Sequence, residues 1–341
     1  GNKRGGVAMA TVAACGGFAA ISGSSIATAA TMAKVAIPPM RRYNYDEGFA
    51  AGTVAAGGTM GILIPPSAAL IIYGILTEES IGDLFIAGIV PGIITVLLYI
   101  AVIWIVARFR PQMAPRAERA TWRVRWVTLS KVWAVVVLFL AIIGGITFGI
   151  FTPTEGGGIG AIGALLFAIA RRRMNFKIFY YALAEAAETT AMIFTIAFGA
   201  LVLNSFVNIA EMPGAIVAFI KDLEIAPIYV ILVILLIYVL LGTVIEGLAM
   251  IFLTVPIFVP LVEAMGFDLI WFGIVLVMVV EISLITPPIG LNVFVIKSML
   301  PDVPLAAIFR GIVPFFIADI ARLMLVVFIP GLAIWLPSLL R

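Results

Sequence analysis

The feature that most constrains this chain is a series of apolar runs, each about 20 residues long. Residues 84–107, 132–150 and 313–336 are the clearest examples. A helix rises about 1.5 Å per residue, so such a run crosses the roughly 30 Å of hydrocarbon in a bilayer. None of these runs has the polar face of a soluble helix. Of the 341 residues, 63% are hydrophobic and 11% charged, whereas soluble domains carry about 25% charged residues. We therefore predict membrane-spanning segments.

The apolar runs are continuous, which favours helices over the alternating strands of a membrane barrel. We expect an all-α integral membrane protein. The chain has no histidine and a single cysteine, Cys15, which excludes His-based metal sites, His-dependent triads and an internal disulfide. A net charge of +3, divided among loops, gives no indication of nucleic-acid binding. We predict no enzyme activity, no cofactor and no transition-metal site.

Basic residues indicate which connections face the cytoplasm, because cytoplasmic loops carry an excess of Lys and Arg. The densest group lies in residues 108–131 and comprises Arg108, Arg110, Arg116, Arg119, Arg123, Arg125 and Lys131. A second group comprises Arg171, Arg172, Arg173 and Lys177. We expect both groups to be cytoplasmic. The acidic group Glu78, Glu79 and Asp83 is then expected outside.

The first 42 residues predict a re-entrant hairpin. Lys3 and Arg4 precede an apolar stretch and Arg41 and Arg42 follow it, so both ends prefer the cytoplasm. About 35 residues lie between these pairs, which is too few for two complete spans and a turn. The middle, residues 21–25, is polar and rich in serine. We expect residues 5–38 to enter from the cytoplasm, turn at mid-membrane and return.

Two halves of the chain repeat the same three features. Ser22 begins a polar tip that is followed after 43 residues by Pro65-Pro66, and Thr243 begins a tip that is followed after 44 residues by Pro287-Pro288. Gly-Ile-Val-Pro then starts at Gly88 in the first half and at Gly311 in the second, 23 and 24 residues later. Three features spaced alike to within one residue indicate an internal repeat.

The second hairpin, residues 227–262, is expected to enter from the opposite side. It is flanked by Lys221, Asp222 and Glu224 and by Glu263 and Asp268, which lack a basic excess. Inverted repeats with interrupted helices near the midplane are typical of secondary transporters. The second repeat begins near residue 132, about 111 residues before its tip, whereas 21 residues precede the first tip. We infer that about 90 residues precede Gly1 in the full protein.

The repeat divides the chain into three parts. Residues 1–107 form the first half of a transport domain, with hairpin 5–38, a broken helix at 47–76 and a span at 84–107. Residues 108–220 form scaffold spans and contain the basic loop 108–131. Residues 221–341 form the second half, with hairpin 227–262, a broken helix at 269–299 and a span at 312–336; residues 301–310 are expected to form a short surface helix.

The broken helices and hairpin tips predict ion sites. Consecutive prolines interrupt the hydrogen-bond ladder of a helix and leave carbonyl oxygens without partners, and a partly dehydrated sodium ion is a suitable partner. Half-helix C-termini at the tips attract cations and N-termini attract anions. The first predicted sodium site comprises Ser22, Ser24, Ser25, Gly61, Ile64 and Pro66, and the second comprises Gly242, Thr243, Thr286 and Pro288. Residues expected near a carboxylate substrate are Gly23, Ser67, Glu246, Gly247 and Asn292.

Three stretches resemble the large membrane subunit of TRAP (tripartite ATP-independent periplasmic) transporters. They are residues 20–29 (AISGSSIATA), 51–67 (AGTVAAGGTMGILIPPS) and 151–155 (FTPTE), and the likeness extends over essentially the whole chain. The resemblance implies a bacterial inner-membrane protein that works with a small membrane subunit and a periplasmic substrate-binding protein. It further implies sodium-coupled uptake of carboxylates such as C4-dicarboxylates or sialic acid by an elevator motion, with two sodium sites at the hairpin tips. Gly156-Gly157-Gly158 departs from the expected alanines.

Several residues also have simpler interpretations. The tip serines can serve helix packing, either Pro-Pro pair can be a kink, and Thr152–Glu155 fits a structural capping box. Glu246 is either a helix cap or a charge that balances the site. Asp319 and Arg322, three residues apart, are expected to neutralise each other, and Glu185 and Glu188 either contact a neighbouring subunit or remain solvated.

Three other functions are compatible with an apolar chain of this kind to different degrees. An intramembrane serine protease lacks its usual base in a chain without histidine, and a channel needs a continuous pore that two opposed hairpins would block. A stand-alone sodium/dicarboxylate-type symporter of similar architecture is the main alternative. It differs in working without a binding protein.

Overall fold

The computed structural model describes residues 3–118, 121, 123, 126, 133–222 and 224–340, and within these ranges the regular structure is helical. Arg119, Arg125 and Lys131 of the predicted basic loop, and the first residue of the predicted span 132–150, lie outside the described residues. Five of the described helices have the length and composition needed to cross a membrane: α5 (Ile81–Phe109), α8 (Pro153–Ala170), α9 (Phe176–Ile209), α12 (Gly247–Ala264) and α15 (Leu305–Phe328). The chain is accordingly a multi-pass membrane protein.

The first repeat opens with a helical hairpin, α1 (Gly6–Ser22) and α2 (Ser25–Arg42), joined at Gly23 and Ser24. Gly23 has a φ of +58°, a left-handed conformation that ends α1 and favours glycine. Ser24 then caps α2 by accepting the Ala27 N–H at 3.3 Å. The following span is broken into α3 (Glu47–Thr59), the 3₁₀ turn η1 (Met60–Ile62) and α4 (Ala68–Thr77), and α5 comes next.

The second repeat has the same order of elements. The hairpin is α11 (Pro227–Gly242) and α12, and the broken span is α13 (Leu269–Ser283) and α14 (Leu291–Met299). Both Pro-Pro bonds are cis, Pro65-Pro66 in the first break and Pro287-Pro288 in the second.

The end of the second repeat differs from the sequence expectation. The structure has one helix, α15, that starts at Leu305 and passes through Pro314 without interruption, in place of a surface helix at 301–310 and a span at 312–336. The chain breaks instead at Ile329 and Pro330, before α16 (Gly331–Leu340). A proline disfavours the helical conformation of the residue before it, which explains why the helix ends there.

The two repeats run in opposite directions. The start of α3, the end of α5 and the loop before α15 meet at one end of the molecule. The Asp46 N–H before α3 donates to the Met113 carbonyl after α5 at 3.1 Å, and Arg41 at the end of α2 pairs with Asp302 in the loop before α15 at 2.5 Å. We call this the basic end, since Lys3, Arg4, Arg41, Arg42, Arg108, Arg110, Arg116, Lys297 and Arg310 all lie in its helix ends and loops. At the opposite end, the Tyr73 hydroxyl of α4 donates to the Leu269 carbonyl at the start of α13 at 2.6 Å.

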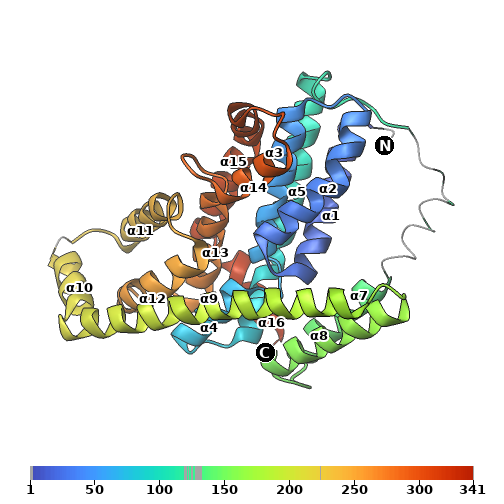
Figure 1. Ribbon diagram of the computed structural model, residues 1–341. Helices are drawn as coiled ribbons and strands as arrows, with labels where there is room; N and C mark the ends of the chain where they lie inside the picture. The colour runs from blue at the N-terminus through green and yellow to red at the C-terminus, as the bar shows by residue number, and fades with distance from the viewer. Residues whose placement is uncertain are drawn as a thin grey trace.

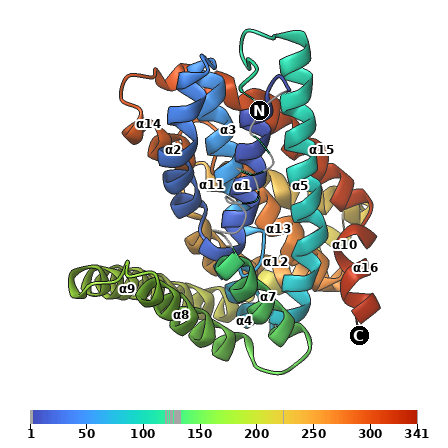
Figure 2. The same cartoon turned by 90° about the vertical axis from the view of Figure 1, so that its right-hand side faces the viewer.

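The central part of the chain packs less tightly than the repeats. It comprises α7 (Trp133–Thr147), α8, the 34-residue α9 and α10 (Met212–Asp222). In both views α9 lies crosswise to the steep helices α1, α3 and α5 and passes beyond the tip of the first hairpin (Figures 1 and 2). Only Ala200 and Val207 of α9 are buried, whereas every residue from 48 to 59 in α3 and from 270 to 283 in α13 is buried. The repeats therefore hold the core.

Candidate functional site

The tip of the first hairpin gathers oxygen atoms against the first helix break. Ser22 Oγ lies 2.7 Å from Thr28 Oγ1, and Thr28 donates to the Ser24 carbonyl at 2.8 Å. A Cβ on Gly61 would overlap this Ser24 carbonyl, and a Cβ on Gly23 would lie 2.9 Å from the Pro66 carbonyl oxygen. The absence of a side chain at both glycines thus lets the tip and the break touch through their backbones. The structure brings together Ser22, Gly23, Ser24, Gly61 and Pro66.

Ile64 and Ser67 stabilise the first helix break. The Ile64 side chain packs on the α1 and α5 backbones at Gly16 and Gly92. Ser67 is fully buried, donates to the Ile62 carbonyl and accepts the Leu70 N–H at 3.3 Å. Its hydroxyl therefore satisfies a carbonyl freed by the prolines and caps α4, so Ser67 is committed to local hydrogen bonds rather than directed into the cavity described below.

The second tip and its break are less closely joined. Gly242, at the end of α11, packs directly on the Ser283 side chain, so tip and broken span also meet here. Thr243 donates to the Leu240 carbonyl at 2.7 Å and Thr286 donates to the Ile282 carbonyl at 2.6 Å, both within their own helical turns. Pro288 is exposed. The second predicted set is thus placed on facing segments without a network like that of the first.

Glu246 caps α12, which is the first of the two roles that the sequence suggested for it. Its Oε2 accepts the N–H groups of Leu248 and Ala249 at 2.9 and 3.0 Å. Gly247 follows directly and packs against Val280 of α13. Two amides satisfy one carboxylate oxygen, which leaves the other able to take a further partner.

Asn292 connects the two repeats. Its Oδ1 accepts the Ser25 hydroxyl at 2.9 Å and its Nδ2 donates to the Ala55 carbonyl at 3.2 Å. Asn292 is fully buried and Ser25 is 3% exposed. Asn292 therefore joins the first hairpin and the first broken span to the second broken span, and both of its polar groups are already used.

A cavity of about 560 Å³ lies where the two tips face each other. Residues of both tips contribute to its wall: Ser22, Gly23, Ser24 and Ser25 from the first, and Glu246 and Gly247 from the second. The opposite wall is formed by α9, through Glu185, Thr189, Met192 and Ile193. Sequence reasoning placed Glu185 at a subunit contact or in solvent, and did not assign Thr28 or Thr189 to the site. Thr28 lies within the motif at residues 20–29, whereas no local motif marks Thr189.

A buried charge cluster lies in the core, on α5, α13 and α15. Arg322 pairs with Glu281 at 2.7 Å and with Asp319 at 3.3 Å, and Tyr99 donates to Asp319 at 2.7 Å. Arg322 also donates to the Thr95 hydroxyl. The predicted pairing of Asp319 with Arg322 is present, but the shorter contact is to Glu281, which the sequence did not single out. The cluster ties α13 to α15 and leaves Glu281 Oε1 without a hydrogen bond.

The chain matches the family model described as the tripartite ATP-independent periplasmic transporter, DctM component, over residues 1–332. It is 37% identical over 341 residues to the C4-dicarboxylate TRAP transporter large permease protein DctM of Pseudomonas aeruginosa, covering 99% of this chain and 79% of that protein. It is 32% identical over 324 residues to the sialic acid TRAP transporter large permease protein SiaM of Vibrio cholerae, covering 94% and 75%.

A solved structure shares the fold at low sequence similarity. The crystal structure of the Alcanivorax borkumensis YdaH transporter matches with a TM-score of 0.61 and 13% identity, covering 95% of this chain and 84% of the other. The family match confirms the resemblance inferred from residues 20–29, 51–67 and 151–155. The chain belongs to the DctM-component family, the large permease proteins of tripartite ATP-independent periplasmic transporters.

Proposed function

We propose that this chain carries an organic anion across the bacterial inner membrane together with Na⁺, after a periplasmic binding protein has delivered the anion. The substrate is a carboxylate such as a C4-dicarboxylate or sialic acid, and a small membrane subunit completes the transporter. The observation that carries the proposal is the common cavity of the two hairpin tips, one of which presents its oxygens against a proline-broken span. The family and its relatives support the transport role.

The donor set at the first tip fits a small hard cation. Hydroxyl oxygens of Ser22 and Thr28 lie beside the carbonyl of Ser24, and the Pro66 carbonyl approaches Gly23. Hard cations prefer oxygen ligands, and unwound backbone supplies them in transporters with interrupted helices. We place the first sodium ion here. The second is placed between Gly242, Thr243, Thr286 and Pro288.

The cavity itself suits an anion only when cations are bound. The N-termini of α2 and α12 both reach the cavity, and helix N-termini favour negative charge. Glu185 and Glu246, however, place two carboxylates around the same cavity, on its two facing walls, and like charges in one cavity repel each other. Sodium at the tips would offset that repulsion. This gives a physical reason for coupled binding of Na⁺ and substrate.

The alternating-access step is proposed as an elevator motion. The moving part would be residues 1–107 and 221–341, whose helices interlock through Asn292 and the Arg322 cluster. The central helices α7–α10 would stay in place, which is consistent with the few buried residues of α8 and α9. A body held together by buried polar contacts can move as a unit against a loosely packed neighbour.

Uptake by the reconstituted transporter tests this function. The complete transporter is placed in proteoliposomes, and labelled succinate and labelled sialic acid are offered together with the binding protein encoded next to this gene. We expect saturable uptake of the anion that the binding protein holds, driven by an inward Na⁺ gradient and lost in choline. Uptake without Na⁺ would refute the coupling, and equal uptake without the binding protein would favour the stand-alone symporter.

Hydroxyl variants test the proposed ion sites. We expect Ser22→Ala and Thr286→Ala each to raise the half-saturating Na⁺ concentration about fivefold, as expected for the loss of roughly 1 kcal/mol from one oxygen ligand. Ser298→Ala is the matched control, because Ser298 also donates to a carbonyl in its own helix but is exposed near the basic end. If both site variants keep the Na⁺ dependence of the control, the site assignment is wrong.

A further inference from the structure

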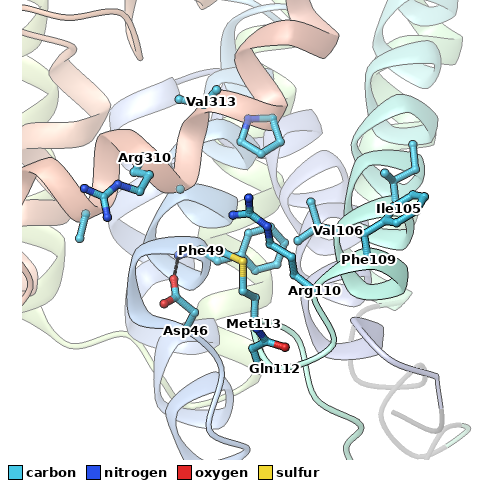
Figure 3. Close-up of a pocket in the computed structure, with 13 residues that line it drawn as sticks. Asp46, Phe49, Ile105, Val106, Phe109, Arg110, Gln112, Met113, Arg310 and Val313 are labelled. Atoms are coloured by element: carbon cyan, nitrogen blue, oxygen red, sulfur yellow. Dashed lines mark hydrogen bonds between the residues drawn. The ribbon is translucent and has the colours of Figure 1, made fainter.

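A crevice of about 770 Å³ lies at the basic end of the molecule, away from the cavity between the tips. It is bounded by the start of α3, the end of α5 with the loop that follows, and the first turns of α15 (Figure 3). The residues around it include Asp46, Ile105, Phe109, Arg110, Arg310 and Val313. Its volume is in the range of ligand sites, roughly 300–1,000 Å³, and far exceeds that of an inorganic anion.

Two arginines give the crevice its charge. Arg110 projects into it from the loop after α5, and Arg310 lines it from α15, with its guanidinium extending away from Arg110 (Figure 3). Within the described part of the chain, neither guanidinium forms a hydrogen bond or an ion pair. The nearby carboxylate of Asp46 is engaged as the cap of α3, where it accepts the Phe49 N–H at 2.8 Å. Among the described residues, the crevice therefore offers two cations without a partner and one carboxylate that already has one.

The remaining wall is apolar and belongs to helices that can span the membrane. Ile105 and Phe109 on α5 are 46% and 80% exposed, and Val313 on α15 is 51% exposed. Both helices are long and apolar enough to cross a bilayer. Exposed apolar side chains on such helices face hydrocarbon more favourably than water. The crevice thus combines a charged mouth with walls suited to acyl chains.

The position of the crevice favours the cytoplasmic leaflet. It lies at the end where the basic residues of both repeats gather, whereas Glu78, Glu79, Asp83, Glu263 and Asp268 lie at the opposite end. An excess of Lys and Arg marks the cytoplasmic side of membrane proteins. That leaflet carries anionic lipids, and basic pockets between membrane helices bind their headgroups.

We propose that this crevice binds an anionic phospholipid of the cytoplasmic leaflet. The lipid phosphate lies at Arg110, Arg310 adds positive charge at the rim of the crevice, and an acyl chain follows Ile105, Phe109 and Val313. The lipid contacts α3, α5 and α15 together and thereby links both repeats at one end. This site is separate from the proposed sodium and substrate sites and does not depend on them.

Native mass spectrometry of the delipidated, full-length permease tests the proposal. The probes are phosphatidylglycerol, phosphatidylcholine with the same acyl chains, and glycerol phosphate. The site variant is Arg110→Gln with Arg310→Gln. The matched control is Arg173→Gln with Lys177→Gln, which removes two positive charges outside the crevice. We expect retained phosphatidylglycerol in wild type and control and at least about tenfold weaker retention in the site variant, since each arginine near an anionic lipid contributes roughly 1 kcal/mol.

A second variant separates lipid binding from simple charge. Val313→Trp fills the apolar wall and keeps both arginines, so it should also weaken phosphatidylglycerol retention. Melting curves in detergent establish that each variant is folded before it is compared. Equal retention of phosphatidylglycerol by wild type and the site variant, or equal retention of phosphatidylcholine, would overturn the proposal. Glycerol phosphate binding as tightly as the lipid would overturn it in favour of a free-anion site.

Discussion

The two broken spans have the same place in the repeat and opposite ways of packing. Helix α3 is built from small residues, with Phe49 and Val54 as its large apolar side chains between residues 48 and 59. Helix α13 is built from bulky residues, including Trp271 and Phe272, and contains the buried Glu281. Residues 48–59 of α3 and residues 270–283 of α13 are all buried. The repeat therefore fixes where the helices lie, while each half uses its own side chains to fill the space.

Helix α15 meets both kinds of packing. Near its start, Gly311 approaches the backbone of α3 so closely that an added Cβ would overlap the Gly48 carbonyl. About three turns further on, Arg322 pairs with Glu281 of α13. Small residues let membrane helices approach through their backbones, whereas a buried charge demands a partner. The first broken span should thus be sensitive to added volume and the second to lost charge.

The largest loss of stability is expected when Arg322 is replaced. Replacement by methionine in Arg322→Met leaves Glu281 and Asp319 buried without their cation, and breaking a buried ion pair costs about 3–5 kcal/mol. We expect a large fall in the melting temperature in detergent. Arg42→Met is the control, because Arg42 is exposed and lies outside the buried cluster and the crevice. Adding Glu281→Leu to Arg322→Met should recover part of the loss, and equal melting of wild type and Arg322→Met would contradict the importance of the cluster.

An intermediate effect is expected at Gly311. In Gly311→Ala the new methyl group must push α3 and α15 apart, and overpacking of this kind costs about 1–3 kcal/mol. The matched control is Gly17→Ala in α1, where nothing lies within 4 Å of an added Cβ. Alanine there should be neutral or gain up to about 1 kcal/mol of helix propensity. The melting temperatures of Gly311→Ala and Gly17→Ala are measured in the same detergent. Equal melting temperatures would contradict the expectation that the first broken span is sensitive to added volume.

The smallest effect is expected at Arg41, which joins the repeats at the exposed basic end. It pairs with Glu47 at 2.8 Å and with Asp302 at 2.5 Å, but its side chain is 36% exposed. Exposed ion pairs contribute about 0–1 kcal/mol and are screened by salt. Arg41→Gln should therefore lower the melting temperature slightly in low salt and not at all in 1 M NaCl. If Arg41→Gln lowered the melting temperature as much as Arg322→Met, solvent exposure would not explain why the two ion pairs are expected to differ in strength.

Much of the architecture could be predicted because it depends on local backbone chemistry. Proline removes a donor, Gly23 accepts a left-handed conformation, and Ser24, Thr152 and Glu246 cap helices within one turn of themselves. The predicted breaks at residues 47–76 and 269–299 accordingly match α3–α4 and α13–α14 closely. The predicted span 312–336 differs from α15, because the apolar run 313–336 does not show that the helix already starts at Leu305 and ends before Pro330.

The sequence alone thus determined a membrane-embedded helical chain, its repeat, its helix breaks and its family, since hydropathy, proline and glycine act over one turn or one span. Only the tertiary structure decided that Asn292 joins Ser25 to Ala55, that Glu281 rather than Asp319 makes the shorter pair with Arg322, and that α9 closes the cavity with Glu185 and Thr189. These partners lie up to 267 residues apart. Which of many polar side chains meet is set by the packing of whole helices, and no local pattern records it.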